Sequence, residues 1–459
     1  MSRSPHTTVD CVVVGGGLAG LLAARNLYRA GLSVVVLEAR DRIGGRMHRE
    51  SLPSGQWIDR GGQWVGPTQT RFLALLDEYG LRRYPSPATG RSVLLYDGTR
   101  YEFDGFFQGF PEGDAPGVPE ADWQDAMEAW ERFDALCKAF PPGHPIPHDE
   151  NKKLDGRTFA DWINDNTNTA FGRWYFSYMA RAVGFLGPAE PTEVSLLHVL
   201  WGQHCAPQAD HPEAELIHGG AGQIPPLIAA ELEGHIRVGE PVHRINQDDA
   251  GVTVETMNGT YRGSFVVVAM PPHLAGRIHY APPLPSLRQQ LTQRVPMGSC
   301  AKIHLSYSRP FWRDKGLSGI GLGNCRTIEL CADSSDPEMG VGLIAAFVAG
   351  DRYHAWRALD DEQRRAAVLA DVAAYFGEEA RSPATYDEMD WPTEPWTGGG
   401  YAAFMPPGVW TSYGAALTEP IGRIHWAGTE MSDAWPGFFE GAIRTAEHTV
   451  AAILNEASR

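Results

Sequence analysis

The N-terminal segment restricts the fold of this chain more than any other part of the sequence. Residues 9–14 read Val-Asp-Cys-Val-Val-Val, a short apolar run that is typical of a buried parallel strand. A glycine-rich stretch, Gly15–Gly20, leads into a segment of helical composition at 18–30, and a second apolar run at 34–37 ends at Glu38. Strand, glycine turn, helix and strand in this order predict a βαβ unit that opens a doubly wound parallel sheet. We therefore expect an α/β fold with a Rossmann-type domain.

The glycines of this unit have the spacing of a dinucleotide-binding turn. In the pattern Gly-x-Gly-x-x-Gly, Gly15 makes the tight turn, Gly17 admits a pyrophosphate, and Gly20 lets helix and strand pack closely. The unpaired N–H groups at the helix N-terminus then face the phosphates. Glu38 stands at a strand end, where its carboxylate can accept hydrogen bonds from ribose hydroxyls. A plain glycine turn is the alternative, but the strand, the helix and the acid around it favour a nucleotide site.

Two further segments favour FAD over NAD. The segment after the ribose acid carries Arg40, Arg46 and a pair of glycines, so guanidinium and backbone amide groups can reach a second phosphate and the flavin end. A second glycine-rich segment contains Gly62, Gln63 and Trp64 in a loop that can lie flat against a ring. We therefore predict that both segments bind a flavin dinucleotide.

Signals of the nucleotide-binding domain recur far along the chain, so two domains are expected to be interleaved. A length of 459 residues exceeds one ordinary core. Apolar runs at 264–269 and 424–427 predict strands that return to the first sheet, and residues 438–455 predict a final helix. The FAD-binding domain is expected to comprise 1–90, 215–295 and 405–459, and a substrate-binding domain of mixed sheet and helices to comprise 91–214 and 296–404. The other predicted elements are helices at 121–138, 158–181, 192–205 and 360–376, strands at 236–239, 252–257, 300–308 and 341–348, and loops at 106–120 and 139–149.

Composition and charge exclude several classes of function. The formal net charge is −17, whereas nucleic-acid binding requires a basic surface, so we expect no nucleic-acid partner and a preference for cationic substrates. The six cysteines form no Cys-x-x-Cys pair, which disfavours zinc and disulfides and fits a cytoplasmic location. No apolar run reaches about 18 residues and no signal-peptide pattern is present, so we expect no membrane association. His204, Cys205 and His211 lack the spacing of metal ligands, and no metal is expected.

Three motifs in the C-terminal half resemble those of the flavin-dependent amine oxidases, the family of the monoamine and polyamine oxidases. They are Lys302 in Met-Gly-Ser-Cys-Ala-Lys-Ile, the segment from Trp391 to Gly-Gly-Gly-Tyr401, and Ala-Gly-Thr-Glu430 with the following Trp-Pro-Gly-Phe-Phe-Glu-Gly-Ala. The N-terminal motifs are shared with other flavoproteins, but with these three the resemblance spans nearly the whole chain. It implies an enzyme that oxidises an amine by hydride transfer to flavin N5. The imine is then hydrolysed to a carbonyl compound, and O₂ is reduced to H₂O₂.

The resemblance also implies roles for single residues. Lys302, which in an unknown protein would be read as a strand-end lysine extending to solvent, would hold a water at flavin N5. Tyr401 and Phe438 would flank the substrate amine, and Phe438 stands where the family commonly has a second tyrosine. Val242 would meet the adenine, and the helix that begins near Phe439 would face the flavin pyrimidine edge. The other cofactor-binding residues implied by the C-terminal motifs are Trp391, Gly428 and Glu430.

Positions matched to the substrate pocket indicate the kind of amine. Glu213 falls where monoamine oxidases often have glutamine, and a carboxylate there could recognise the second ammonium of a diamine or polyamine. The alternative for Glu213 is a solvated loop acid, because Asp210 and Glu215 are close in sequence. Four other matched positions are large and apolar, which suits an aromatic or aliphatic amine. These four are Phe185, Leu186, Leu330 and Phe347.

The sequence departs from the family at the flavin linkage and leaves other functions open. Gly400 occupies the place of the cysteine that monoamine oxidases link to the flavin, so noncovalent FAD is expected.

An L-amino-acid oxidase would need a cation for the substrate carboxylate, and none of the matched pocket positions is arginine. A polyamine oxidase has the same fold. Desaturases and porphyrinogen oxidases lack both a lysine matching Lys302 and the Gly-Gly-x-Tyr motif, which disfavours that function. A flavin-binding protein without catalysis would not require these residues, so their presence disfavours that alternative too. A homodimer is compatible with the sequence, which does not define the oligomeric state.

Overall fold

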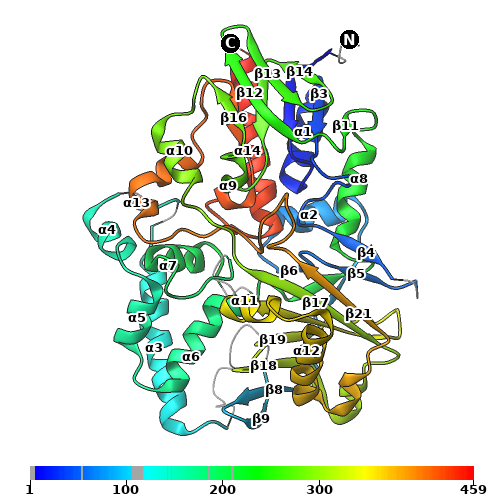
Figure 1. The fold of residues 1–459 in the computed structure, drawn as a ribbon, viewed down its shortest axis with the longest axis vertical. Helices are drawn as coiled ribbons and strands as arrows, with labels where there is room; N and C mark the ends of the chain where they lie inside the picture. The colour runs from blue at the N-terminus through cyan, green and yellow to red at the C-terminus, as the bar shows by residue number, and fades with distance from the viewer. Residues whose placement is uncertain are drawn as a thin grey trace.

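A five-stranded parallel sheet forms the centre of the half that contains the N-terminal βαβ unit, which lies at the top of Figure 1. The computed structural model describes residues 6–458, apart from 53–54, 106–116, 142, 146, 184–186 and 208–210. Every pair of neighbouring strands in this sheet is parallel. The strands, in spatial order, are β11 (Ile236–Arg237), β3 (Val34–Leu37), β2 (Cys11–Val14), β15 (Phe265–Val268) and β22 (Ile424–Trp426).

Both faces of this sheet are covered, which explains the continuous valine runs in its strands. Val13 and Val267 pack into one core with α1 (Leu18–Arg29) and α14 (Phe439–Ala457). Val12 and Val266 point to the opposite face and pack against a second, mixed sheet of five strands. The strands of this second sheet, in spatial order, are β1 (His6–Thr8), β14 (Thr260–Gly263), β13 (Gly251–Thr256), β12 (Val242–Asp248) and β16 (His279–Ala281).

A seven-stranded sheet organises the other half of the molecule. Strand β17 (Cys300–Tyr307), which carries Lys302, is buried along its whole length between two antiparallel neighbours. Helix α12 (Asp361–Phe376) covers one face of the sheet, and α3 (Glu120–Lys138) and α6 (Ala170–Tyr178) pack against the other. The strand order is β21 (Thr385–Asp390), β17, β20 (Gly342–Ala349), β19 (Leu330–Asp333), β18 (Leu317–Gly323), β8 (Arg91–Tyr96) and β9 (Thr99–Phe103).

Smaller elements connect the two halves. A three-stranded sheet has the order β6 (Trp64–Val65), β10 (Glu215–Ile217) and β7 (Arg83–Pro85), and β4 (Arg49–Ser51) pairs with β5 (Trp57–Asp59). The remaining α-helices are α2 (Thr70–Glu78), α4 (Asp149–Asp155), α5 (Phe159–Asn166), α7 (Leu196–Cys205), α8 (Ile224–Ala230), α9 (Pro272–Ala275), α10 (Ser286–Thr292), α11 (Asp351–Arg357) and α13 (Val409–Tyr413).

The α/β fold predicted from the N-terminal unit is confirmed, but the helix predicted over 158–181 is wrong as a single element. Thr167 is extended (φ −124°, ψ 142°) and ends α5. The carboxylate of Asp125, on α3, accepts hydrogen bonds from the backbone N–H groups of Asn168 and Thr169, at 2.9–3.0 Å. This contact between distant segments overrides local helix propensity, and after α6 the chain adopts a π-helical turn at Met179–Val183.

Other sequence predictions need smaller corrections. The predicted strand 236–239 is reduced to two residues, and α4 begins at the end of the predicted loop 139–149. Most of the predicted loop 106–120 lies outside the described residues. Strands β8, β9, β18, β19 and β21 had no predicted counterpart. The residue boundaries of the two domains stay a prediction.

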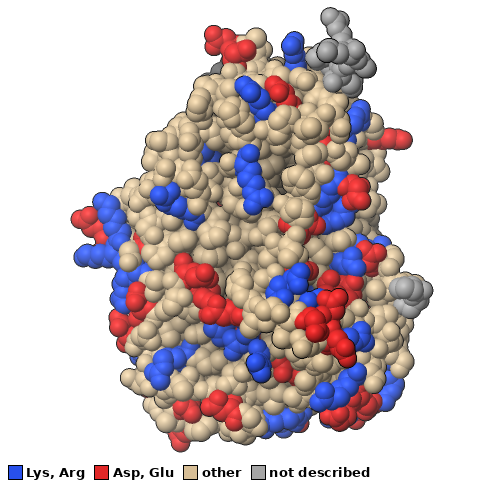
Figure 2. All heavy atoms as spheres, viewed as in Figure 1, with Lys and Arg blue, Asp and Glu red and all other residues tan. Residues whose placement is uncertain are grey.

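Charge distribution, helix hydropathy and cysteine burial complete the description of the fold. Figure 2 shows acidic and basic side chains interspersed over the lower part of one face, whereas the upper part carries fewer of them. Within the described residues, every helix is too short or too polar to cross a bilayer. All six cysteines are free thiols, and five of them are buried.

Candidate active site

One cavity joins the nucleotide motif to the predicted amine site. At one end it is lined by Gly15, Gly17 and Glu38, which follow β2 and β3 of the parallel sheet. At the other end it is lined by Lys302 of β17 and by Tyr401. The carboxyl ends of parallel strands therefore open toward the sheet that carries Lys302, as expected for a ligand site in an open α/β sheet.

The glycine turn packs as the dinucleotide motif requires. A Cβ added to Gly15, whose φ is +109°, would lie 2.5 Å from the carbonyl oxygen of Ala269 on the neighbouring strand. A Cβ at Gly20 would lie 2.0 Å from the carbonyl oxygen of Gly15, so this glycine permits close helix packing and lies behind the cavity wall. At Gly17 a Cβ would meet no described atom within 4 Å, which leaves the backbone accessible to a ligand.

Glu38 fixes this turn from the next strand. Its Oε2 accepts a hydrogen bond from Gly16 N (2.7 Å) and its Oε1 accepts one from Arg40 N (2.9 Å). The side chain is buried, yet the residue still lines the cavity. The predicted ribose acid thus also holds the phosphate-binding loop in place.

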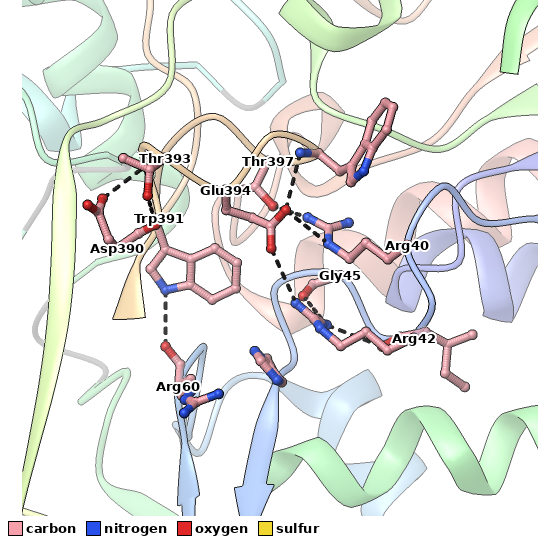
Figure 3. A network of polar contacts seen from close by, with 12 residues as sticks. Arg40, Arg42, Gly45, Arg60, Asp390, Trp391, Thr393, Glu394 and Thr397 are labelled. Atoms are coloured by element: carbon pink, nitrogen blue, oxygen red, sulfur yellow. Dashed lines mark hydrogen bonds and ion pairs between the residues drawn. The ribbon is translucent and has the colours of Figure 1, made fainter. Parts of the chain in front are cut away.

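Two arginines near this loop share one carboxylate from the other half of the chain (Figure 3). Arg40 Nε lies 3.5 Å from Glu394 Oε1, and Arg42 Nη2 lies 4.0 Å from Glu394 Oε2. Arg40 Nη2 also donates to the Thr397 hydroxyl at 2.5 Å. Burial and the neighbouring charge of Arg40 lower the pKa of Arg42. Arg40 Nη1 also lies 3.4 Å from Glu38 Oε1, so two carboxylates hold the two guanidinium groups, whose N–H groups suit a pyrophosphate.

Arg46 links the nucleotide wall to the amine end. It forms a two-pronged ion pair with Glu430, and its Nη1 donates to the Tyr401 carbonyl oxygen at 2.6 Å. Burial alone would raise the pKa of Glu430, but the adjacent Arg46 charge outweighs it and the pKa is lowered. Arg46 lines the cavity, whereas Glu430 lies behind it. Glu430 therefore acts on this site through Arg46.

Lys302 is enclosed and has three hydrogen-bond acceptors. Its Nζ donates to the carbonyl oxygens of Asp59 (2.8 Å) and Gly61 (2.7 Å) and to Gln63 Oε1. The ammonium also lies 5.2 Å from the centre of the Trp64 ring, within the range of a cation–π contact. Burial lowers the pKa of Lys302 to about 7. The loop that carries Gly62, Gln63 and Trp64 is thus held at the cavity by the lysine.

Aromatic and apolar side chains form the amine end of the cavity. The Tyr401 hydroxyl donates to the Ala182 carbonyl oxygen (3.2 Å), and its ring packs edge-on against Phe347 at 5.9 Å. Phe438 is the N-terminal cap residue of α14, and its ring packs edge-on against Trp435 at 5.2 Å. Leu330, Phe347, Tyr401 and Phe438 all line the cavity. Both predicted aromatic walls therefore have fixed orientations.

Most of the other predicted cofactor residues also line this cavity. The Phe439 ring packs against Gly62, where an added Cβ would come within 2.6 Å of it. Trp391 Nε1 donates to the Arg60 carbonyl oxygen (3.0 Å), which joins β21 to the loop after β5. Val242 and Gly428 line the cavity as well. Of the predicted pocket residues, Leu330, Phe347 and Glu213 line it, and Phe185 and Leu186 lie outside the described residues.

Sequence reasoning missed several residues that build this site. Glu394 and Thr397 lie in the segment between Trp391 and Tyr401, whose motif was recognised only at its ends. In the sequence, Asp59 was treated only as the first residue of a glycine-rich loop. In the structure its carboxylate accepts hydrogen bonds from the backbone N–H groups of Ala221 and Gly222. These three residues could have been suspected, because each is a polar residue inside a recognised motif. The sequence did not show which groups they would contact.

Comparison with known proteins identifies the family. The sequence profile of the flavin containing amine oxidoreductases matches residues 18–454. The chain belongs to this family. An L-amino acid dehydrogenase of Synechocystis sp. is 66% identical over 98% of this chain and 96% of that protein. A probable flavin-containing monoamine oxidase A of Dictyostelium discoideum is 35% identical over 96% of each chain. A solved double mutant of putrescine oxidase has a TM-score of 0.92 at 32% identity, over 98% of this chain and 100% of that chain.

The protein is thus a flavin-containing amine oxidoreductase with FAD as its cofactor, as predicted. The described residues fit that cofactor. The Arg40 Nε group is buried and lies 3.5 Å from Glu394 Oε1 without a hydrogen bond to the described residues, so its N–H can donate to a phosphate. The glycine turn would be blocked by a Cβ at Gly15, and Glu38 lies at the ribose position of the motif.

Proposed function

We propose that this protein oxidises a primary amine to an imine, which water converts to a carbonyl compound and ammonia. The observation that carries this proposal is the single cavity that contains both the nucleotide motif and the aromatic walls Tyr401 and Phe438. When bound, FAD accepts the hydride that leaves the carbon next to the amine nitrogen. The protein then has to bind and orient the amine and keep water away from it.

The described residues divide these tasks. Tyr401 and Phe438 present ring faces, to which an amine is attracted. Leu330 and Phe347 supply apolar surface for the carbon skeleton of the substrate. Burial raises the pKa of Tyr401 well above its usual value, so its hydroxyl stays protonated and does not act as a base. The amine must therefore enter the slot in its neutral form.

We propose that Lys302 assists the reoxidation of the reduced flavin. As an ammonium it places one positive charge in the wall that is built from Asp59, Gly61 and Gln63. With O₂ as acceptor, two electrons and two protons give H₂O₂, and a nearby cation favours the development of negative charge on oxygen. The family role of this lysine, as a residue that holds a water, is proposed for this chain as well.

A second candidate is the oxidation of an L-amino acid with an electron acceptor other than O₂. It is favoured by the L-amino acid dehydrogenase of Synechocystis sp., which is 66% identical to this chain. The geometry does not favour it, because two cations that line this part of the cavity are already engaged: Lys302 donates to three acceptors, and Arg46 is paired with Glu430. A substrate carboxylate would have to displace one of these partners.

Anaerobic reduction of the bound flavin tests the first proposal without regard to the acceptor. Purified holoenzyme is mixed with a panel of amines and L-amino acids, and the loss of flavin absorbance is recorded. Each active compound is then assayed for H₂O₂ in air and for dye reduction without air. Bleaching by amines with H₂O₂ formation is expected. Bleaching by L-amino acids but not by the matching decarboxylated amines would transfer the assignment to the second candidate, and no bleaching by either class would refute both.

A further inference from the structure

Among the described residues that line the cavity, Glu213 is an acid whose position is not explained by cofactor binding. It lines the cavity together with Ala182, Leu330 and Phe347, on the side of the aromatic walls. It lies between α7 and β10, in a segment without regular secondary structure. Acidic residues in such segments are usually solvated, and Glu213 is instead half-buried.

The backbone at Glu213 is held by three polar contacts from elsewhere in the chain. The fully buried Gln69 donates from Nε2 to the Pro212 carbonyl oxygen (2.9 Å). Ser86 donates from Oγ to the Glu213 carbonyl oxygen (2.7 Å) and from its backbone N to the Ala214 carbonyl oxygen (2.8 Å). Three successive carbonyl groups are therefore fixed, and the carboxylate is attached to a rigid support.

Close packing adds to this constraint. A Cβ at Gly66 would lie 2.6 Å from the His211 carbonyl oxygen and 2.7 Å from the Pro212 Cα. The segment His211–Pro212, which leads into β10, thus lies directly on the loop that follows β6, and the two strands pair through Glu215 and Val65. A rigid backbone restricts the positions of the Glu213 carboxylate before a ligand binds, which lowers the entropic cost of binding.

The charge of Glu213 acts on the amine end of the cavity. Burial first, then Cys300 and then Glu213, raise the pKa of Tyr401. After Asp59, Glu213 is a further carboxylate that opposes the lowering of the Lys302 pKa by burial. The carboxylate therefore lies within electrostatic range of both the aromatic slot and the lysine.

We propose that Glu213 makes the enzyme select amines that carry a second cationic group, an ammonium or a guanidinium, separated from the reacting amine by an apolar spacer. The proposal rests on the proposed amine oxidation. Leu330 and Phe347 would contact the spacer, Tyr401 and Phe438 the reacting amine, and Glu213 the distal cation. A hydrogen bond to a charged partner in such a site is strong enough to dominate the choice between a cation and a methyl group of similar size.

Paired substrates that differ only at the distal group test this inference. Cadaverine is compared with hexylamine, and lysine with 2-aminoheptanoate, with kcat/KM for flavin reduction as the readout. The wild-type enzyme should prefer the cationic member of at least one pair by about tenfold or more, and Glu213→Gln should reduce that preference by about ten- to hundredfold. The readout is the ratio of the two rates within each variant, because the neutral member reports any effect of the lost charge on Tyr401 and Lys302.

Glu215→Gln is the matched control, because it makes the same charge change two residues away. Glu215 forms its ion pair with Arg83 and does not line the cavity, so the substrate preference should be retained. Flavin content and thermal melting show whether each variant is folded. If the wild type oxidises both members of each pair equally, the inference fails while the proposed function stands. If it oxidises neither cadaverine nor hexylamine nor any other amine of the panel, the proposed function itself fails.

Discussion

Arg46 and Glu430 are 384 residues apart in sequence and form a two-pronged ion pair, with Nη1–Oε1 at 2.6 Å and Nη2–Oε2 at 3.1 Å. Arg46 follows the first βαβ unit, and Glu430 follows the last strand of the same sheet. Because Arg46 also donates to the Tyr401 carbonyl oxygen, the pair joins the nucleotide wall to the aromatic slot. Interleaved chain segments are thus fixed to one another at the cavity.

Loss of this pair should weaken both stability and FAD binding. Glu430→Gln removes the negative charge behind Arg46, which is only partly exposed, and should destabilise the protein by about 2–4 kcal/mol, near the range for breaking a buried pair. Urea unfolding and FAD dissociation measure the two effects. Glu419→Gln, at an exposed site, is the control and should change neither. Equal stability of the two variants would contradict the role of the pair.

The Glu430 pair should also persist in acid. The pKa of Glu430 is lowered in the folded protein, so its contribution is fully present above the pKa of an unfolded glutamate and is lost only as pH falls through the lower, folded value. The difference in stability between wild type and Glu430→Gln should therefore remain constant from neutral pH down to the ordinary range of a glutamate, and shrink below it. A difference that vanishes already near pH 6, a value about one and a half units above that range, would contradict the lowered pKa.

Glu38 should contribute to FAD affinity through both its charge and its contacts. Glu38→Ala removes the acceptor for Gly16 N and Arg40 N as well as the proposed ribose contact, and should weaken FAD binding by about 1.5–3 kcal/mol. Glu38→Gln keeps one acceptor oxygen and should lose less. Titration of the apoprotein with FAD compares the two variants. Unchanged affinity in Glu38→Ala would remove this residue from the site.

Lys302→Met should slow flavin reoxidation by O₂ more than flavin reduction by the amine. The variant removes a buried cation and leaves three acceptors without a donor, and such a group contributes about a hundredfold or more when it assists proton or charge transfer. Stopped-flow traces of each half-reaction measure the two rates separately. Lys153→Met, at an exposed position, is the matched control. An oxidative half-reaction that keeps its rate would count against the proposed role.

The two half-reactions should respond to pH in opposite directions. Only a neutral amine has a free lone pair, and Tyr401 is no base, so reduction at low substrate concentration should rise with pH toward the amine pKa. The pKa of Lys302 is lowered to about 7, so its ammonium is present below that pH and lost above it. Reoxidation that depends on the ammonium should fall as pH rises through 7, and Lys302→Met should remove this dependence. Two flat profiles would contradict both assignments.

The sequence predicted those parts of the site in which backbone geometry is encoded locally. The turn at Gly15–Gly20 and Glu38 follow from a short motif, and the structure places them as the motif requires. Contacts between distant segments could not be predicted in this way. The pairing of Arg40 with Glu394 and the break at Thr167 depend on partners more than 40 residues away, and local propensity does not encode them. The same limit explains why the strands at the edge of the substrate sheet were missed.

The last prediction concerns the bond between the flavin and the protein. Gly400 has no side chain, and the described residues that line the cavity include no cysteine, so no thiol is available for a thioether to the flavin ring. A Cβ at Gly400 would meet its nearest neighbour, Trp391, at 3.5 Å, an ordinary van der Waals distance, so Gly400→Ala should keep the fold and the bound FAD.

Acid precipitation of the wild type and of Gly400→Ala should therefore leave the yellow flavin in the supernatant, and the protein mass should equal that of the chain alone. Flavin absorbance that remains with the washed pellet, or a mass increased by one flavin, would show a covalent bond and would contradict the match of Gly400 to the linking cysteine. Loss of FAD from Gly400→Ala alone would instead show that this wall of the cavity tolerates no side chain, contrary to the free space next to Trp391.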